Sequence, residues 1–263
     1  MTHGTTAAGF RQAERHLAGL TARAEKRALL WLAPRVPGRV TSDHLTLLGL
    51  VSMAAGGLLY AASGRWPWLL LLVNVALAFN WLGDSLDGTL ARHRRVERPR
   101  FGFYVDHLVD AFGAVFLLGG LAVSGLMSPL VALGFLAAYF LLSIETYLAT
   151  YAIGRFRISW GPIGGTELRI LLAALNGLVL FRPRLSLGGT SWLLFDVLGV
   201  GASAGLVALA VVAGLRGTRE LARIEGWAPP QGTRGPAFPV ALRGPSGSGG
   251  LSSPPGPPRC VTP

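Results

Sequence analysis

Six long apolar segments constrain the fold of this chain more than any other feature of its sequence. They cover about residues 45–63, 66–90, 103–123, 129–153, 167–181 and 190–214. A helix needs about 20 apolar residues to cross the hydrocarbon core of a bilayer. Five of the six segments reach about that length, and the segment 167–181 is shorter. The pattern therefore predicts an all-α integral membrane protein with six transmembrane helices.

The charge of the chain is sparse and strongly basic. Charged residues make up 14% of the sequence, against about a quarter in a soluble domain, and 51% of the residues are hydrophobic. The net charge of +11 comes almost entirely from arginine, because Lys26 is the only lysine. A soluble protein with this charge would be a candidate for nucleic-acid binding. Here the arginines lie beside apolar segments, so we expect contacts with anionic membrane lipids and no nucleic-acid partner.

The distribution of arginine predicts the orientation in the membrane. Basic residues are concentrated in residues 11–39, 92–100 and 155–169, before the first segment, after the second and after the fourth. The loops on the opposite side carry three arginines in total. Cytoplasmic loops of membrane proteins hold more Lys and Arg than the loops on the other side. We therefore expect an integral protein of the cell (inner) membrane with both termini in the cytoplasm.

The two ends of the chain differ from its apolar centre. Residues 10–34 interleave apolar and basic side chains, as in an amphipathic helix that lies in the membrane interface or packs on the rest of the protein. The C-terminal residues are rich in Pro, Gly and Ser, which is typical of disorder. We therefore divide the chain into a juxtamembrane segment 1–40, a membrane domain 41–215 and a cytoplasmic tail 216–263. The N-terminus lacks the apolar core of a signal peptide, and the single cysteine, Cys260, excludes an internal disulfide.

Four of the six aspartates lie between residues 84 and 110, where the second and third apolar segments meet. An ionised aspartate at the centre of a membrane helix costs about 2.5–3.5 kcal/mol, so these carboxylates need compensating partners. Asp84 and Asp87 are three residues apart and therefore share a helix face. Asp106 and Asp110, four residues apart, share a face of the next helix. A short basic loop joins the two helices, so we expect antiparallel neighbours whose carboxylates converge in a cleft open to the cytoplasm.

The oxygen-rich character of this cluster favours a hard divalent cation. Carboxylate oxygens suit Mg²⁺ or Mn²⁺, which complete their coordination with water and substrate phosphates. Two such ions on one phosphoryl group are a known catalytic arrangement, and no His/Cys cluster in the sequence indicates zinc. Gly88 and Gly102 lie beside the acids, where the lack of a side chain permits close approach of a ligand or a neighbouring helix.

The same stretch matches the signature of an enzyme family. The pattern D-x2-D-G-x2-A-R, followed after nine residues by G-x3-D-x3-D, is present at all eight fixed positions. These positions are Asp84, Asp87, Gly88, Ala91, Arg92, Gly102, Asp106 and Asp110. Because the pattern lies on two adjacent membrane helices, the chain resembles, over about residues 40–215, the CDP-alcohol phosphotransferases, also called CDP-alcohol phosphatidyltransferases.

This resemblance implies six transmembrane helices around a polar cytoplasmic cleft, in a homodimer. It implies a phospholipid-biosynthetic transferase in which an acceptor alcohol attacks a phosphorus of a CDP-linked lipid or alcohol and CMP leaves, with two Mg²⁺ or Mn²⁺ ions. Asp84, Asp87 and Asp106 would bind metal, and Asp110 would act as the general base and also touch the metal. The residues that the resemblance assigns to the CDP group here are Asp84, Gly88, Ala91, Arg92 and Gly102.

The stretch TSDHLT, residues 41–46, resembles a further element of this family at the start of the first span. It implies that Asp43 and Thr46 contact the CDP group, although Ser42 stands where the family usually has proline. An alternative is that Ser42 or Asp43 caps the N-terminus of the helix, and the two roles are compatible. The basic loop HRRVERPRF lacks the Ser or Thr with which some relatives contact the nucleotide.

Two branches of the family differ in donor and acceptor. One transfers from CDP-diacylglycerol to a polar alcohol, and the other transfers a CDP-linked choline or ethanolamine headgroup to diacylglycerol. The residues that resemble the second branch, where acids and an aromatic ring would hold a cationic headgroup, are His107, Glu145, Tyr147 and Glu167. The residues that would hold an acceptor phosphate, as in the first branch, are Arg155, Arg157 and Arg169. The sequence slightly favours an amino-alcohol substrate.

Each of these candidates has a structural alternative, and so does the enzyme itself. The arginines also fit determinants of topology or contacts with lipid headgroups, and the glutamates fit buried, hydrogen-bonded or arginine-paired acids. A divalent cation transporter would likewise place carboxylates in membrane helices, but near the midplane and on repeated or broken helices. The aspartates here lie near one face, without a counterpart in the second half of the chain, which favours the enzyme.

Overall fold

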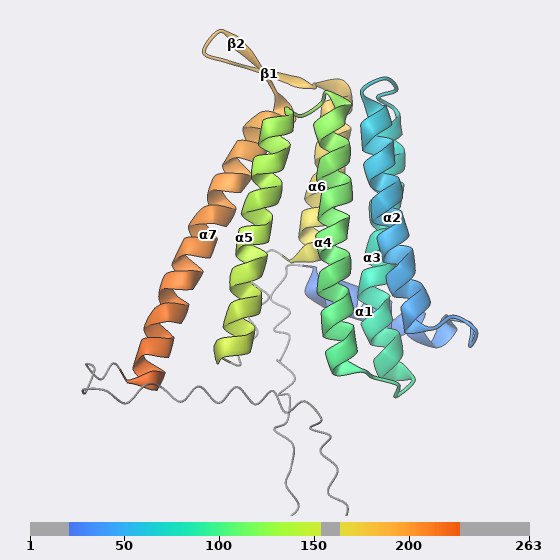
Figure 1. Ribbon diagram of the computed structural model, residues 1–263. Helices are drawn as coiled ribbons and strands as arrows, with labels where there is room; N and C mark the ends of the chain where they lie inside the picture. Colours follow the sequence, from blue (N-terminus) through green and yellow to red (C-terminus); the bar gives the residue numbers. More distant parts are fainter. Residues whose placement is uncertain (1–20, 154–163, 227–263) are drawn as a thin grey trace, which may run out of the picture. The chain divides into compact units, whose positions relative to one another are not determined.

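The computed structural model describes residues 21–153 and 164–226, and these form mainly long helices (Figure 1). The helices are α1 (Ala22–Leu32), the short 3₁₀ helix η1 (Ala33–Arg35), α2 (Ser42–Ser63), α3 (Leu69–His93), α4 (Pro99–Ser124), α5 (Pro129–Ile153), α6 (Gly165–Phe181) and α7 (Leu194–Glu225). Strands β1 (Arg184–Leu187) and β2 (Thr190–Leu193) form an antiparallel hairpin between α6 and α7. The start of the predicted amphipathic helix, residues 10–20, and most of the predicted tail lie outside the described residues.

Five of the described helices, α2, α3, α4, α5 and α7, are long and apolar enough to cross a membrane. This finding supports the integral, helical membrane protein expected from the sequence. α5 coincides with the predicted segment 129–153, and α7 continues to Glu225, beyond the predicted domain end at residue 215. α6 has 17 residues and is therefore about 26 Å long at about 1.5 Å per residue. A sixth transmembrane span at α6 stays a prediction.

The β-hairpin is the main departure from the predicted segments. Residues 190–193 were expected to begin the last transmembrane helix, but they form β2, and α7 begins at Leu194. Gly188 and Gly189 adopt positive φ angles of 59° and 80°. Two adjacent residues in this conformation form the tight turn that joins antiparallel strands, and glycine adopts it without strain. The glycine pair therefore turns the chain back before it enters the last helix.

α2 packs closely against both α3 and α4, because the residues at these contacts are glycines, which have no side chain. A Cβ atom added at Gly83 of α3 would lie 2.5 Å from the carbonyl oxygen of Leu45 in α2. A Cβ atom added at Gly120 of α4 would lie 2.0 Å from the carbonyl oxygen of Gly57 in α2. Small residues permit membrane helices to approach each other in this way. The contact at Gly83 also holds the next residue, Asp84, close to α2.

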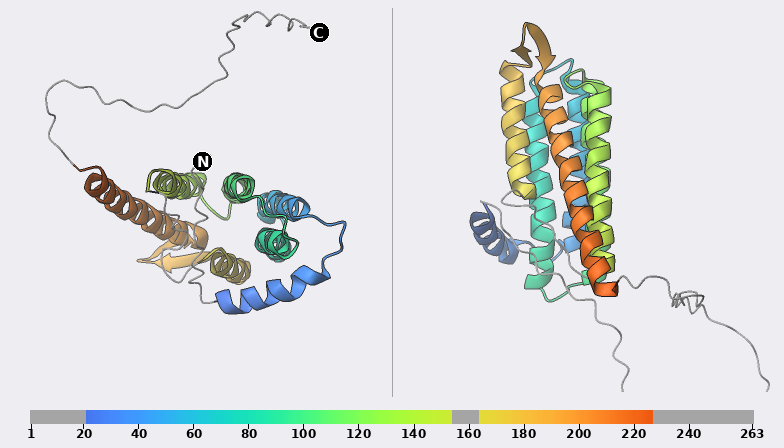
Figure 2. Two further views of the ribbon diagram at one scale, coloured as in Figure 1. Left: turned by 90° about the horizontal axis from the view of Figure 1, so that it is seen from below. Right: turned by 90° about the vertical axis from the view of Figure 1, so that its left-hand side faces the viewer.

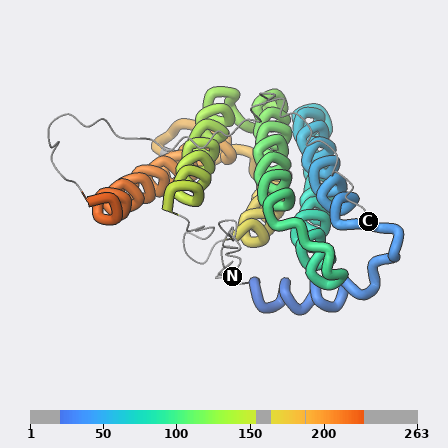
Figure 3. Tube along the Cα trace, turned by 60° about the horizontal axis from the view of Figure 1, so that its bottom comes forward, coloured from blue at the N-terminus to red at the C-terminus, as the bar shows by residue number. Residues whose placement is uncertain are grey.

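α1 lies crosswise to the longer helices, at the end of the bundle where α3 ends and α4 begins (Figures 2 and 3). Glu25 of α1 accepts hydrogen bonds from Trp81 Nε1 at 3.2 Å and from Ser85 Oγ at 2.8 Å, both in α3. Arg94, just after α3, donates hydrogen bonds to three carbonyl groups within residues 36–40 and so fixes the linker between η1 and α2. The buried apolar side chains under α1 are Leu29, Ala33, Leu45, Leu86 and Leu90.

Buried polar side chains join α6 to α2 and α3. Tyr60 Oη donates to Asn176 Oδ1 at 2.7 Å, and Asn176 Nδ2 donates to Asn74 Oδ1 at 2.7 Å. Asn74 Nδ2 in turn donates to the carbonyl oxygen of Ala173 at 3.1 Å. Tyr60 and Asn176 are fully buried. Since an unpaired polar group is costly in an apolar environment, this network fixes α6 against its two neighbours.

We expect Gly83→Ala to destabilise the protein, because the added methyl group would overlap the carbonyl group of Leu45 and force α3 away from α2. Overpacking of this kind costs about 1–3 kcal/mol. The matched control is Gly134→Ala in α5, where a Cβ atom meets nothing within 4 Å. Thermal unfolding in detergent, followed by tryptophan fluorescence, compares both variants with the wild type. An unchanged unfolding midpoint in Gly83→Ala would contradict the close contact of α2 with α3.

Candidate active site

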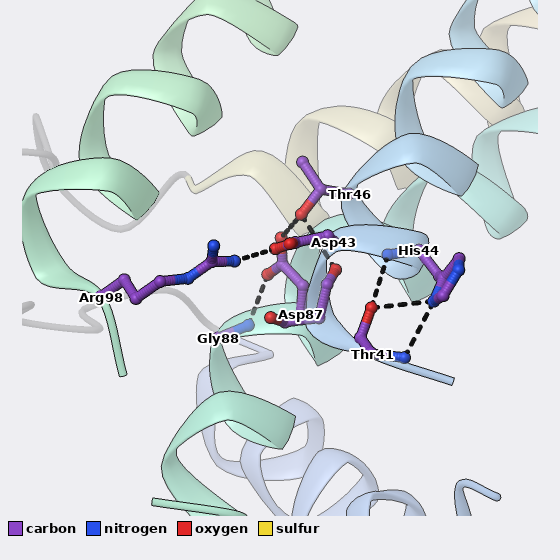
Figure 4. A network of polar contacts seen from close by, with 8 residues as sticks. Thr41, Asp43, His44, Thr46, Asp87, Gly88 and Arg98 are labelled. Carbon is purple, nitrogen blue, oxygen red and sulfur yellow. Dashed lines mark hydrogen bonds and ion pairs between the residues drawn. The ribbon is translucent and has the colours of Figure 1, made fainter. Parts of the chain in front are cut away.

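The N-terminus of α2 is fixed by a capping box (Figure 4). The amide of His44 donates to Thr41 Oγ1 at 3.4 Å, and the amide of Thr41 donates to His44 Nδ1 at 3.1 Å. Thr41 is therefore the N-cap residue, and the alternative that Ser42 or Asp43 caps this helix is wrong. The side chain of Asp43 instead forms an ion pair with Arg98, the residue that precedes α4. This ion pair connects the starts of α2 and α4.

Asp87 of α3 is held by hydrogen bonds from two directions. Thr46 Oγ1 donates to Asp87 Oδ2 at 2.6 Å, and the amide of Gly88 donates to Asp87 Oδ1 at 2.5 Å (Figure 4). The negative charges of Asp84 and Asp106 act on the same carboxylate. A hydroxyl group from α2 and acids from α3 and α4 therefore lie in one neighbourhood.

Asp84 forms an ion pair with Arg169 of α6. Arg169 Nη2 donates to Asp84 Oδ2 at 2.6 Å, and Arg169 Nε donates to Asn80 Oδ1 at 2.7 Å. Asn80 is only 3% exposed, and its Nδ2 donates to the carbonyl oxygen of Gly49 in α2 at 3.1 Å. The guanidinium group is thus oriented by a buried amide as well as by the carboxylate. Asn80 is absent from the residues predicted from the sequence, although its place four residues before Asp84 puts it on the same helix face.

The other two aspartates of the signature lie in the first half of α4. Asp106 is partly buried and Asp110 is exposed. The charge of Asp106 acts on Asp87 of α3, and the charge of Asp110 acts on Tyr139 and Tyr147 of α5. These charges connect α4 to α3 and α5, although the described helices that pack against α4 are α2 and α5, so the expected direct packing of α3 on α4 is replaced by packing of both on α2. Tyr139 is a second residue of this neighbourhood that the sequence pattern does not indicate.

Among the described residues, no three His, Cys, Asp or Glu side chains are close enough together to hold a metal ion in this arrangement. Asp84 is paired with Arg169, and Asp87 accepts from Thr46. Carboxylate oxygens are nevertheless the donors that Mg²⁺ and Mn²⁺ prefer. The donor set therefore fits a hard divalent cation, and binding one requires the carboxylates to exchange their present partners.

A pocket of about 570 Å³ lies beside the start of α2. This volume is within the range of small-molecule sites. The residues that line it are Thr41, Ser42, Asp43, Leu90, Ala91, Arg94, Val96, Glu97 and Arg98. Two of the residues predicted to contact CDP, Asp43 and Ala91, are therefore part of this pocket, and Arg98 is a lining residue that the sequence did not indicate.

The other residues predicted to contact CDP do not line this pocket. They are Thr46, Asp84, Gly88, Arg92 and Gly102. Arg92 is exposed, and its Nη2 donates to Thr89 Oγ1 at 3.3 Å. A Cβ atom at Gly102 would meet nothing within 4 Å, and one at Gly88 would meet only the side chain of Arg92, at 3.6 Å. Among the described residues, neither glycine is therefore required by a neighbouring helix, and close approach of a ligand stays a prediction for both.

The predicted acceptor residues have different neighbours. The rings of His107 in α4 and Tyr147 in α5 make an edge-to-face contact with centroids 4.9 Å apart. Glu145 lies on another side of α5, where its Oε1 is 3.9 Å from the position of a Cβ atom built on Gly217 of α7. The structure therefore does not bring Glu145 to the same side of α5 as Tyr147. The two arginines predicted for an acceptor phosphate that lie outside the described residues are Arg155 and Arg157.

Glu167, another predicted acceptor residue, connects α6 to α1. Its Oε1 accepts hydrogen bonds from the amide of Thr21 at 2.8 Å and from Thr21 Oγ1 at 2.7 Å. Its Oε2 accepts from the amide of Gly164 at 2.9 Å, which closes the first turn of α6. These contacts correspond to the alternative of a hydrogen-bonded acid.

Comparison with protein families identifies a match that spans most of the membrane region. The family model described as CDP-alcohol phosphatidyltransferase matches residues 39–214. The match covers more than half of the 263 residues, from just before α2 to well inside α7. It includes the capping box, the four aspartates between residues 84 and 110, and Arg169. No curated protein matches the chain.

We expect Glu167→Ala to loosen α1, because the variant removes three hydrogen bonds accepted by one carboxylate. Loss of charged hydrogen bonds should raise amide exchange in residues 21–26 by about tenfold. Glu145→Ala, which removes an acid beside α7, is the matched control and should leave this exchange unchanged. Hydrogen–deuterium exchange with mass spectrometry measures both. Equal protection of α1 in Glu167→Ala and wild type would show that Glu167 is not what fastens it.

Proposed function

Because the chain belongs to the CDP-alcohol phosphatidyltransferase family, we propose that it transfers a substituted phosphoryl group from a CDP-alcohol to an acceptor alcohol and releases CMP. Membership makes the protein a transferase of phospholipid synthesis with membrane-spanning helices. The observation that carries the specific proposal is the arrangement of Asp84 and Asp87 on α3, where Arg169 of α6 and Thr46 of α2 reach them, inside the matched region. The aspartates lie near one end of their helices, and the second half of the sequence has no corresponding set of acids. Both features support catalysis over ion transport.

The four aspartates would hold two Mg²⁺ or Mn²⁺ ions, with Asp84 and Asp87 from α3 and Asp106 and Asp110 from α4. When bound, these ions supply positive charge that neutralises the pyrophosphate of the donor and improves CMP as a leaving group. Thr46 keeps Asp87 oriented through the hydrogen bond of 2.6 Å. The rigid contact of α2 with α3 thereby sets the position of one carboxylate before any ligand arrives.

The donor binds with its nucleotide in the pocket beside α2, which Asp43 and Ala91 line. Arg92, one turn beyond Gly88, would bind the CDP phosphates after leaving its contact with Thr89. The oxygen of the acceptor hydroxyl group attacks the phosphorus of the transferred group, and the bond from that phosphorus to the CMP oxygen breaks. Asp110 accepts the hydroxyl proton, and its exposure makes it accessible to an acceptor.

The side-chain positions support one donor class over the other. Arg169 places a guanidinium group at Asp84, which suits an anionic polar acceptor and hence a CDP-diacylglycerol donor. Glu145 lies beside Gly217 of α7, and Glu167 accepts a hydrogen bond from Thr21 at the start of α1, so the two acids do not form one cage for a cationic headgroup. The aromatic contact of His107 with Tyr147 supports the choline or ethanolamine branch, which is the second candidate. This ranking reverses the slight preference from the sequence.

The proposal includes the relation of the protein to the membrane. Leu30 and Trp31 of α1 are each 58% exposed, beside exposed basic residues of the same helix. Apolar anchors next to basic side chains suit a helix that lies in the interface of an anionic membrane. In this arrangement α1, the aspartates and both termini lie on the cytoplasmic side. The family resemblance adds six spans and a homodimer to the proposal.

Release of CMP tests the proposed reaction. Purified protein is incubated with Mg²⁺ or Mn²⁺, one of CDP-diacylglycerol, CDP-choline or CDP-ethanolamine, and a panel of acceptor alcohols that includes diacylglycerol and phosphorylated polyols. We expect CMP from at least one pair and none after chelation of the metal with EDTA. The productive pair identifies the branch. Failure of every pair to yield CMP would contradict the enzyme.

We expect Asp110→Asn to lower the turnover number by about 10²–10⁴-fold, because the amide keeps the shape of the side chain but cannot accept the proton. Nucleotide binding, measured by calorimetry with CMP, should survive, since Asp110 does not line the nucleotide pocket. Glu225→Gln at the end of α7 is a matched control that removes an acid far along the chain from this region. If Asp110→Asn keeps most of its turnover, the base is another group.

A further inference from the structure

Arg169 forms an ion pair with Asp84, a carboxylate that the proposed function assigns to metal binding. Its Nη2 lies 2.6 Å from Asp84 Oδ2, and the two side chains are only 19% and 29% exposed. At this distance a guanidinium group and a divalent cation on the same oxygen would repel each other strongly, with little screening by water. Asp84 Oδ2 can therefore serve only one of the two positive partners at a time.

A second contact keeps Arg169 in the site independently of Asp84. Arg169 Nε donates to Asn80 Oδ1 at 2.7 Å, and Asn80 is itself fixed by its hydrogen bond to the carbonyl oxygen of Gly49. A Cβ atom at Gly165 would lie only 3.1 Å from Arg169 Nη1, so a larger residue there would crowd the guanidinium group. Release of Nη2 from Asp84 would leave the arginine anchored through Nε.

We propose that Arg169 is an exchangeable counter-ion of Asp84. It neutralises the carboxylate when no divalent cation is bound, and an arriving cation takes its place. The guanidinium group, still held at Nε by Asn80, then binds an anionic group of a ligand, such as a phosphate. This inference rests on the proposed function, because the cation is the one that the four aspartates would hold. Cation and anion then promote each other's binding through one side chain.

The exchange is tested by the chemical reactivity of Arg169 in the full chain in detergent. Phenylglyoxal modifies accessible, unpaired guanidinium groups, and mass spectrometry of peptides gives the rate at each arginine. With saturating Mn²⁺ in place of EDTA, we expect the rate at Arg169 to rise by about tenfold, as for loss of a charged hydrogen bond. The exposed Arg100 is the internal control and should react at the same rate in both conditions. An unchanged or lower rate at Arg169 with bound Mn²⁺ overturns the exchange.

Two further measurements separate exchange from a general loosening of the site. In Asp84→Asn, Arg169 should react rapidly already in EDTA, and Mn²⁺ should not accelerate it further. In the wild type, inorganic sulfate should slow the modification of Arg169 with Mn²⁺ present but not in EDTA. Equal protection by sulfate in both conditions overturns the coupling of cation and anion. If Asp84→Asn does not fold, the wild-type comparisons with Mn²⁺ and sulfate decide the matter.

Mn²⁺ binding, followed by electron paramagnetic resonance on the same sample, separates this inference from the proposed function. Bound Mn²⁺ with unaltered Arg169 reactivity refutes the exchange and leaves the transferase intact. Exchange without CMP release from any donor refutes the transferase and leaves the exchange intact. If Mn²⁺ does not bind, Asp84 is not a cation ligand under these conditions and the exchange is refuted.

Discussion

The need to give every carboxylate in a membrane helix a partner governs this structure. An unpaired charge in such a helix is costly, and the partners cannot come from the apolar neighbours on the same helix. Asp84 and Asp87 lie on α3, but the side chains that contact them come from other helices: Arg169 from α6 and Thr46 from α2. The acids therefore have a favourable environment only when α2, α3 and α6 are packed in one register. Polar contacts at the site and apolar packing around it specify the same arrangement.

The supports of these partners lie deeper in the bundle. Gly83 permits α2 and α3 to touch, which brings Thr46 within 2.6 Å of Asp87. α6 has only 17 residues, and its buried contacts through Asn176 fix it against α2 and α3. Because α6 carries Arg169, this buried network also determines where the guanidinium group meets Asp84. A substitution far from the aspartates can therefore change the charge balance around them.

Local patterns in the sequence predict those parts of the molecule that depend on local physics. Apolar length predicts six transmembrane helices, and five of the described helices are long and apolar enough to cross a membrane. α5 agrees with its predicted ends, because Pro129 begins it after a short turn. The hairpin at Gly188 and Gly189 escapes this pattern, since apolar residues in short strands resemble those of a helix. The N-cap is also missed by one or two residues, because Thr41, Ser42 and Asp43 are all good caps and the structure uses Thr41, in a capping box with His44.

The site shows the same division between local and long-range information. The spacing of the aspartates and the family signature single out α3 and α4, and that information is local to 27 residues of sequence. Arg98 and Tyr139 owe their places to contacts between helices, so no spacing within one helix indicates them. Asn80 shares a helix face with Asp84, but its role depends on the contact with Arg169 of α6, which that spacing does not indicate. Glu167 shows the converse: its position at the edge of an apolar segment suggests a ligand, but its hydrogen bonds go to Thr21 and Gly164. An acid at a membrane helix end can thus serve the fold instead of the substrate.

α1 is held by a second contact besides the one with Glu167. Thr21 contacts Glu167 on α6, and Glu25, one turn later, accepts from Ser85 of α3, the residue next to Asp84. α1 therefore joins the two helices that carry Asp84 and Arg169. If Arg169 leaves Asp84, the attraction between α3 and α6 weakens at this point, but α1 and the Asn80 contact still hold the two helices together. The ion pair can then open by movement of side chains alone, which makes Asp84 available to a cation without unfolding the helices around it.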